Sequence, residues 1–279
     1  MFANKVLVAL DASDAAEKAL KRGVLIADRL GSELEVLWLF NPVAEHPLKR
    51  TIAHLQTDGM VIHEFTHEAK SFLLDVLKRW ESDKFALLIK SCDADHSGLL
   101  APIDWQLLRQ APCPVLLVKK DSLWEGGKIM MAVDPQSTQS DRKTLNTSVL
   151  KMADFIAKEA RAELNVVVSF APPMLGADRA SQTVDLSKQR ATEAAKQLLG
   201  ESGVVPSEYL VGEGPADYWI PHIAKQQQAA LVVIGTRGRD GLKGMLLGNT
   251  AERILDRLVC DVLVVRAGAT ADINQILQR

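Results

Sequence analysis

The strongest constraint on the fold of this chain is an internal repeat. The segment Lys5-Val-Leu-Val-Ala-Leu-Asp11 matches Lys128-Ile-Met-Met-Ala-Val-Asp134, with lysine, alanine and aspartate at the same three places. Near the end of each half, Cys113-Pro-Val-Leu-Leu-Val-Lys119 matches Cys260-Asp-Val-Leu-Val-Val-Arg266. The 279 residues suffice for two domains that each bury a core. We therefore predict a tandem duplication with domains at 1–122 and 123–268 and a C-terminal tail at 269–279.

Each half alternates helical and strand patterns. In the first half, apolar residues at helical spacing predict a helix over 15–30, and Gly31 separates it from an apolar strand at 34–40. The second half predicts helices near 145–161 and 185–199 and from 215 and 250, between strands at 164–170, 208–211, 231–234 and 262–265. Near-continuous apolar strands separated by helices are typical of parallel sheets covered on both faces. The predicted fold class is α/β, with two tandem doubly wound domains and parallel five-stranded sheets.

Composition narrows the class of partner. Lys+Arg 33 against Asp+Glu 35 gives a formal charge of -2, so no basic field favours nucleic acid or an anionic membrane. No stretch approaches the roughly 18 consecutive apolar residues of a spanning helix. The three cysteines are widely separated and form neither a disulfide framework nor a Cys-rich zinc site. We therefore expect a cytoplasmic protein that contacts neither nucleic acid nor membrane.

A glycine-rich segment of the second half predicts a phosphate site. The strand at 231–234 continues into Gly235-Thr-Arg-Gly238, and Gly248-Asn-Thr250 follows nine residues later at the start of a helix. Glycines let the backbone approach an anion closely, and a helix N-terminus supplies free N–H groups and a favourable dipole. Arg237 and Arg239 can add charge-assisted hydrogen bonds, and Asn249 or Thr250 is a competent helix N-cap. The alternative is that Gly235 and Gly238 only form a tight turn between strand and helix.

These motifs resemble a known family. The pattern Gly235-x2-Gly238-x9-Gly248 is similar to the G-x2-G-x9-G-[S/T] signature of nucleotide-binding universal stress proteins, and Gly212-Glu-Gly-Pro215 is similar to their G-x-P turn. The resemblance covers essentially the whole chain, as two such domains in tandem. The segments Asp104-Trp-Gln-Leu-Leu-Arg109 and Leu247-Gly-Asn-Thr-Ala-Glu252 resemble the bacterial tandem-domain subgroup.

The resemblance implies a ligand and a set of site residues. The ligand is ATP or AMP, with or without Mg²⁺, bound in the second domain of the family's adenine nucleotide alpha hydrolase-like fold. Adenosine would meet Val133 and Asp134, and phosphates would meet Gly235, Arg237, Gly238, Gly248, Asn249 and Thr250. Asn249 replaces the family's usual Ser or Thr, so an amide N–H or Thr250 would have to substitute for that hydroxyl. The resemblance also implies an intrachain pairing of the two domains in place of the family's dimer contact, and a further homodimer stays open.

The first half has lost the glycine signature. The repeat alignment puts Lys90, Asp93 and Ala101 where the second half has its three glycines, so side chains take the space of a phosphate. Asp11 and Ser13 follow the first strand, where a carboxylate can cap the next helix without any ligand. We predict no nucleotide in this domain and hypothesise that Lys90 fills or neutralises its pocket.

The segment His63-Glu-Phe-Thr-His67 fits the H-E-x-x-H pattern of zinc metalloproteases. That chemistry needs a helix, but register with the second half predicts a strand, in which residues four apart lie about 13 Å from each other. Apolar residues at helical spacing from Ile62 to Val76 leave a helix open as the alternative. We predict that no metal binds there.

No motif of a familiar enzyme class carries catalysis. The chain has no G-x-x-x-x-G-K-[S/T] loop and no G-x-S-x-G elbow, so motor-type ATPases and α/β-hydrolases are not indicated. We predict a regulatory or protective stress-response protein that binds an adenine nucleotide, with no catalytic residue. Two other functions stay open: a scaffold that is independent of nucleotide or binds another small molecule, and a slow ATP hydrolase.

Overall fold

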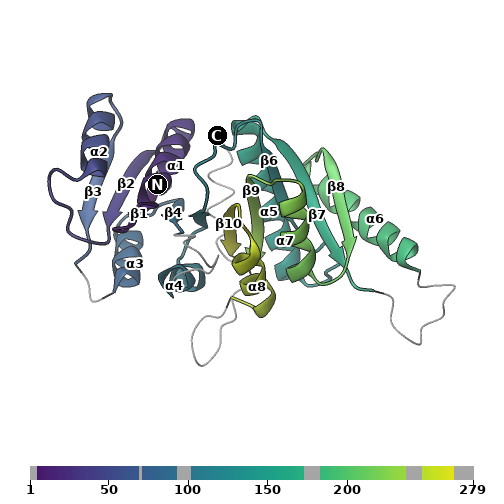
Figure 1. Cartoon of the computed structure of the whole chain (residues 1–279). Coiled ribbons are helices and arrows are strands. Elements are labelled where there is room, and N and C mark those ends of the chain that lie inside the picture. Colours follow the sequence, from purple (N-terminus) through teal and green to yellow (C-terminus); the bar gives the residue numbers. More distant parts are fainter. Residues whose placement is uncertain (1–4, 69–70, 93–101, 173–182, 237–246, 267–279) are drawn as a thin grey trace. The chain divides into compact units, whose positions relative to one another are not determined.

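The computed structural model describes residues 5–68, 71–92, 102–172, 183–236 and 247–266. These residues form two compact units of α/β architecture, separated in sequence between Asp121 and Ser122. In Figure 1 the first unit runs from purple to teal and the second from teal to yellow.

Unit 1 has a parallel sheet of five strands in the order β3-β2-β1-β4-β5. Its strands are β1 (Lys5–Leu10), β2 (Glu33–Trp38), β3 (Ile62–Thr66), β4 (Leu87–Ser91) and β5 (Val115–Val118). Its helices are α1 (Ala16–Leu30), α2 (Pro47–Thr57), α3 (Phe72–Ser82) and α4 (Pro102–Gln110). Because parallel crossovers are right-handed, α1 and α2 cover one face of the sheet and α3 and α4 cover the other.

Unit 2 repeats this topology, with strands in the order β10-β9-β6-β7-β8 and all neighbours parallel. Its strands are β6 (Lys128–Ala132), β7 (Glu163–Phe170), β8 (Glu208–Glu213), β9 (Leu231–Thr236) and β10 (Asp261–Arg266). Its helices are α5 (Ser140–Glu159), α6 (Val184–Ser202), α7 (Ala216–Gln226) and α8 (Asn249–Arg257). By the same rule, α5 and α6 share one face, and α7 and α8 share the other. The predicted doubly wound fold class is therefore confirmed for both halves.

The ends of the elements follow local chemistry. Helix α1 ends at Gly31, whose φ of 57° is left-handed and favours glycine. Helix α5 begins at Ser140, ahead of the predicted start near 145. The sequence did not predict its first turns because they are polar and carry no apolar periodicity. Strand β2 ends at Trp38, two residues before the predicted end. Among the described residues, no helix is long and apolar enough to cross a membrane.

The H-E-x-x-H segment lies in a strand, as its register predicted. Strand β3 pairs with β2 from Leu34↔Ile62 to Trp38↔Thr66, so the helical alternative is wrong for this segment. The helix of this region, α3, begins only at Phe72. Extended backbone holds His63 and His67 too far apart to share a metal. Within the described ranges, no group of three or more His, Cys, Asp or Glu side chains is placed to hold a metal ion.

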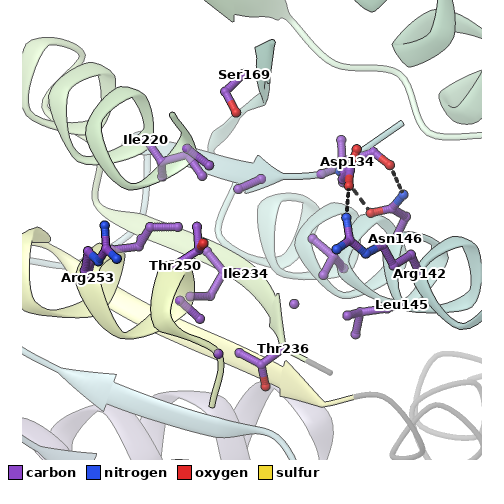
Figure 2. A pocket seen from close by; sticks show the side chains of 18 of the residues that line it. Asp134, Arg142, Leu145, Asn146, Ser169, Ile220, Ile234, Thr236, Thr250 and Arg253 are labelled. Atoms are coloured by element: carbon purple, nitrogen blue, oxygen red, sulfur yellow. Dashed lines mark hydrogen bonds and ion pairs between the residues drawn. The ribbon is translucent and has the colours of Figure 1, made fainter. Parts of the chain in front are cut away.

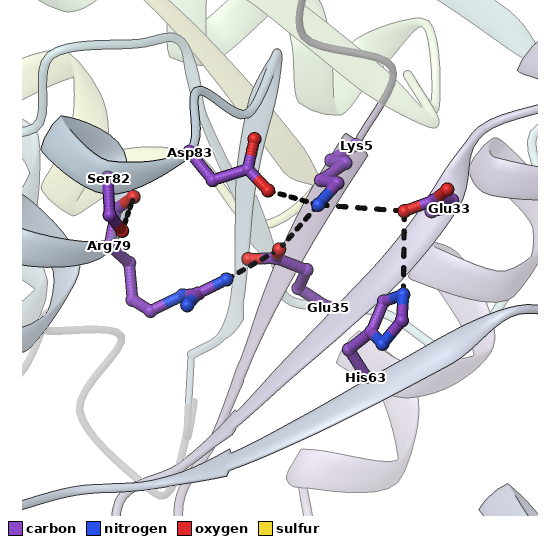
Figure 3. Close-up of polar contacts among 7 residues, drawn as sticks. All are labelled: Lys5, Glu33, Glu35, His63, Arg79, Ser82 and Asp83. Carbon is purple, nitrogen blue, oxygen red and sulfur yellow. Dashed lines mark hydrogen bonds and ion pairs between the residues drawn. The ribbon is translucent and has the colours of Figure 1, made fainter.

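His63 instead belongs to a charged network near the amino ends of β1 and β2 (Figure 3). Its Nε2 lies 3.5 Å from Glu33 Oε2. Lys5 Nζ lies 3.4 Å from Oε1 of the buried Glu35 and also contacts Asp83, and Arg79 lies 2.7 Å from the same Glu35 oxygen. The hydrogen bond to Asp83 is the main cause that raises the pKa of Lys5, and Glu35 adds to it although burial opposes it. The buried Glu35 carboxylate therefore has cationic partners, as a buried charge requires.

Candidate functional site

A cavity of about 750 Å³ opens at the carboxyl ends of β6 and β9 in unit 2 (Figure 2). Strand β6 leads to β7 on one side, and the chain returns through β8 to β9 on the other side. In open parallel sheets, ligands bind where the strand order reverses in this way. The cavity has the size usual for a small-molecule site.

The structure brings most of the predicted site residues together around this cavity. Its walls include Val133, Asp134, Gly235, Gly248, Asn249 and Thr250. The predicted Arg237 and Gly238, and also Arg239, lie outside the described residues. Residues that the sequence did not point to also line the cavity: Arg142, Asn146, Thr236 and Arg253.

Helix α5 fixes Asp134 from two positions one turn apart. The Asn146 side chain accepts a hydrogen bond from the Asp134 backbone N–H at 3.1 Å and donates one to the Asp134 carbonyl at 2.8 Å. Arg142 donates from Nη1 to Asp134 Oδ2. Figure 2 shows these contacts at one side of the cavity. The half-exposed carboxylate keeps lone pairs on Oδ1 that can accept hydrogen bonds from a ligand.

The first turn of α8 offers backbone donors to the cavity. Its N-cap is Gly248, with a φ of 55° and no capping side chain, so the prediction that Asn249 or Thr250 caps the helix is wrong. Both residues lie inside the first turn, because the left-handed backbone at Gly248 already turns the chain into the helix. The first intrahelical bond runs from Glu252 N to Gly248 O at 3.1 Å, so the preceding N–H groups have no partner within the helix. Such a terminus attracts an anion.

Gly235 is required by packing as well. A Cβ at this position would lie 2.6 Å from Leu145 Cγ, so the missing side chain lets α5 approach β9. Glycine at 235 therefore does not by itself indicate a phosphate.

The sheet registers correct the predicted repeat alignment by one residue. Lys90 pairs with Ala9 and Leu117, whereas Ile234 pairs with Ala132 and Val264. Since Ala9 and Ala132 are equivalent in the repeat, Lys90 corresponds to Ile234, and Ser91 corresponds to Gly235. The prediction that Lys90 replaces Gly235 is wrong because Leu87-Leu-Ile89 matches Leu231-Val-Val233 as well as it matches Val232-Val-Ile234. The other two predicted counterparts of the glycines, Asp93 and Ala101, lie outside the described residues.

In unit 1, side chains occupy the place of the cavity. Lys90 Nζ lies 2.9 Å from Asp11 Oδ2, 3.1 Å from Asp104 Oδ1 and 2.8 Å from the Ser91 carbonyl oxygen. Lys90 and Asp104 are almost fully buried, at 2% and 1% exposure of their side chains. The repeat relates Asp11 to Asp134 and, counting back from Cys113 and Cys260, relates Asp104 to Ala251. Lys90 thus fills this pocket, as hypothesised, and forms an ion pair with each of its two carboxylates.

This triad changes the acidity of its members. Burial acts to raise the pKa of Asp11, but the Lys90 ammonium and the Ser13 hydrogen bonds outweigh it, so that pKa lies below its usual value. Burial acts to lower the pKa of Lys90, but Asp104 and Asp11 together raise it above its usual value. Burial is also the main cause that raises the pKa of the neighbouring Cys92 thiol.

Asp11 does not cap α1, which corrects the prediction from sequence. The N-cap of that helix is Ala15, without a capping side chain. Asp11 instead accepts hydrogen bonds from the Ser13 backbone and hydroxyl, which closes a turn ahead of the helix. The helix begins too far along the chain for Asp11 to reach its first N–H groups.

The profile of the Universal stress protein family matches residues 127–266, which lie in unit 2. The chain belongs to the universal stress protein family. Universal stress protein E of Escherichia coli strain K12 is 26% identical to it over 306 aligned positions, covering 95% of this chain and 94% of the relative. This universal stress protein thus resembles that relative across both units.

Two solved structures are also similar to this chain over nearly its whole length. A functionally unknown protein from Pseudomonas aeruginosa PAO1 has a TM-score of 0.82 and 31% identity, covering 99% of this chain and 96% of its own. A putative universal stress protein from Pseudomonas aeruginosa UCBPP-PA14 has a TM-score of 0.81 and 32% identity, covering 99% and 98%.

Proposed function

We propose that this universal stress protein binds an adenine nucleotide, ATP or AMP, in the cavity of unit 2 as a regulatory ligand. The supporting observation is that one cavity joins a fixed, hydrogen-bonding carboxylate to a helix N-terminus without a capping side chain. The two features suit the two chemical parts of a nucleotide.

The phosphates would lie at the first turn of α8. Residues 248–251 at the start of α8 line the cavity, and Gly248 itself carries no side chain there. Arg253 also lines the cavity and adds positive charge, although it lies 3.1 Å from Asp217. Mg²⁺, where present, would be held by phosphate oxygens.

The nucleoside would lie near the end of β6. Asp134 Oδ1 can accept hydrogen bonds from ribose hydroxyls or the adenine amino group, while Asn146 keeps the backbone of that residue fixed. Val133, Ile220 and Ile234 give this part of the cavity apolar walls for the base.

We propose that the protein binds the nucleotide without hydrolysing it. Among the described residues that line the cavity, Asp134 is the one carboxylate, and Arg142 holds it in an ion pair. The ligand would therefore signal or stabilise rather than be consumed. We place this role in the cytoplasm, since the three cysteines are buried thiols.

Calorimetric titration with ATP and Mg²⁺, and with AMP, tests the proposal. We expect one nucleotide per chain, and Gly248→Val should weaken binding at least tenfold because it strains the helix start and adds a side chain at the phosphates. Gly203→Val is the matched control, since that α6 C-cap has a similar φ of 67° and lies outside the cavity.

The same experiment distinguishes the two alternative functions, a nucleotide-independent scaffold and a slow ATP hydrolase. No binding at millimolar nucleotide would overturn the proposal and leave a nucleotide-independent scaffold. Release of phosphate on the time scale of the titration would instead indicate a slow hydrolase.

A further inference from the structure

The last residue of β9 carries a hydroxyl group that lacks a partner. Thr236 is 4% exposed, and its Oγ1 is buried without a hydrogen-bond partner among the described residues. Native structures pair nearly all buried polar groups, so an unpaired one requires an explanation. A bound ligand is one such explanation where the group lines a cavity.

Thr236 lies in the wall of the same cavity as Gly248 and Thr250. Figure 2 shows it at the end of β9, beyond Ile234. Successive side chains of a strand point to opposite faces. Since position 235 faces Leu145 of α5, the Thr236 side chain faces the other side of the sheet, which α7 and α8 cover.

The equivalent position in unit 1 shows which chemical group can lie beside the Thr236 side chain. The register that relates Ser91 to Gly235 relates Cys92 to Thr236. The Cys92 thiol interacts with the carboxylate of Asp104, in the first turn of α4. In unit 2 the equivalent residue is Ala251, which has no polar side-chain atom. The chain itself therefore supplies an anionic oxygen at this position in unit 1, and among the described residues of unit 2 the equivalent residue supplies none.

We propose that Thr236 Oγ1 donates a hydrogen bond to an anionic phosphate oxygen of the ligand, where Asp104 places its carboxylate in unit 1. This inference rests on the proposed nucleotide function and adds to it a residue that selects phosphorylated ligands over the neutral nucleoside. The hydroxyl and the N–H groups of α8 would together surround one phosphate.

The test compares Thr236→Val and Thr236→Ser with the wild-type chain by calorimetry, using ATP, tripolyphosphate and adenosine as probes. Thr236→Val keeps the shape and removes the hydroxyl, so it should weaken ATP and tripolyphosphate binding about tenfold or more. Adenosine binding should not change, and Thr236→Ser should keep the wild-type affinity. Cys92→Val is the matched control in unit 1 and should leave all three affinities unchanged.

The stability of the ligand-free protein gives a second measurement. Removing an unpaired buried hydroxyl should leave the unfolding midpoint of Thr236→Val unchanged or raise it, which a structural hydrogen bond would not allow. A lower midpoint together with weaker adenosine binding would overturn the inference. Equal ATP affinity of Thr236→Val and wild type would overturn it and leave the proposed function intact. Failure of the wild-type chain to bind either ATP or tripolyphosphate would overturn both.

Discussion

At the scale of single residues, the two units exchange a large and a small side chain at one contact. Gly31 and Arg161 both have positive φ, and each lies two residues before its strand, so counting back along α1 and α5 relates Ala15 to Leu145. Leu145 meets Gly235 in unit 2, whereas the positions related to these two residues in unit 1 hold the smaller Ala15 and the larger Ser91.

This exchange predicts coupling between positions 145 and 235. Gly235→Ser should destabilise the chain by about 1–3 kcal/mol because its side chain meets Leu145. Leu145→Ala should also destabilise it, by creating a cavity. The double variant copies unit 1 and should lose less stability than the sum of the two, by at least about 0.5 kcal/mol. Urea unfolding followed by circular dichroism measures all four proteins, and strictly additive losses would contradict the exchange.

Sequence reasoning identified site residues that lie at strand ends and in the glycine motif, and it missed those that depend on distant contacts. Val133 and Asp134 follow a recognisable strand, so their place at the cavity could be predicted. Asn146 touches Asp134 from twelve residues away, and no local pattern announces that contact. Thr236 lies inside the glycine motif, but its role is suggested only by a buried hydroxyl that has no hydrogen-bond partner in the described part of the chain.

At the scale of elements, most strands and helices could be predicted because buried apolar runs and helical stripes are strong local signals. The first turns of α5 could not be predicted, since their residues are polar and mostly exposed. These turns also bring Arg142 to the cavity. The register of β4 could not be predicted either, because only its pairing with β1 and β5 distinguishes Lys90 from Ser91 as the residue equivalent to Gly235.

The Lys90 triad joins β4, α4 and the turn that follows β1, and it predicts a pH-dependent variant. Lys90→Met leaves Asp11 and Asp104 without this counter-ion, which should cost about 3–5 kcal/mol near pH 7. The lowered pKa of Asp11 means that its contribution is present above its unfolded value and is lost as pH falls through its folded value. The raised pKa of Lys90 means that its contribution is present below its unfolded value and is lost as pH rises through its folded value.

The deficit of Lys90→Met relative to wild type should therefore be largest between about pH 5 and 9 and should shrink below about pH 4, where Asp11 takes up a proton. Thermal unfolding across this range measures it. Lys158→Met is the control, since that exposed ion pair with Asp154 should contribute less than about 1 kcal/mol at any pH. A deficit that is independent of pH would show that Lys90 acts through packing alone.

At the scale of the whole molecule, duplication has produced one open cavity and one that the chain fills with its own charges. Asp134, Ile234 and Ala251 line the cavity of unit 2. Their equivalents in unit 1 are Asp11, Lys90 and Asp104, which form the buried triad. Lys90 contacts the carboxylate of Asp11 in unit 1, and the equivalent position in unit 2 holds the apolar Ile234. At these three positions the filled pocket of unit 1 and the open cavity of unit 2 therefore differ by two residues: Lys90 corresponds to Ile234, and Asp104 corresponds to Ala251.

This difference predicts that the chain binds one nucleotide and that the open unit can be closed. Ile234→Lys combined with Ala251→Asp copies the triad into unit 2, so it should abolish ATP binding while the ligand-free protein stays folded. Hydrogen exchange read by mass spectrometry locates the effect in the wild-type chain. ATP should slow exchange at 132–136 and 247–254, and leave 7–13 and 102–108 unchanged, because Lys90 already occupies the place a ligand would take in unit 1. Protection of both sets of segments, or two nucleotides per chain, would show that the triad opens and that both copies of the fold bind.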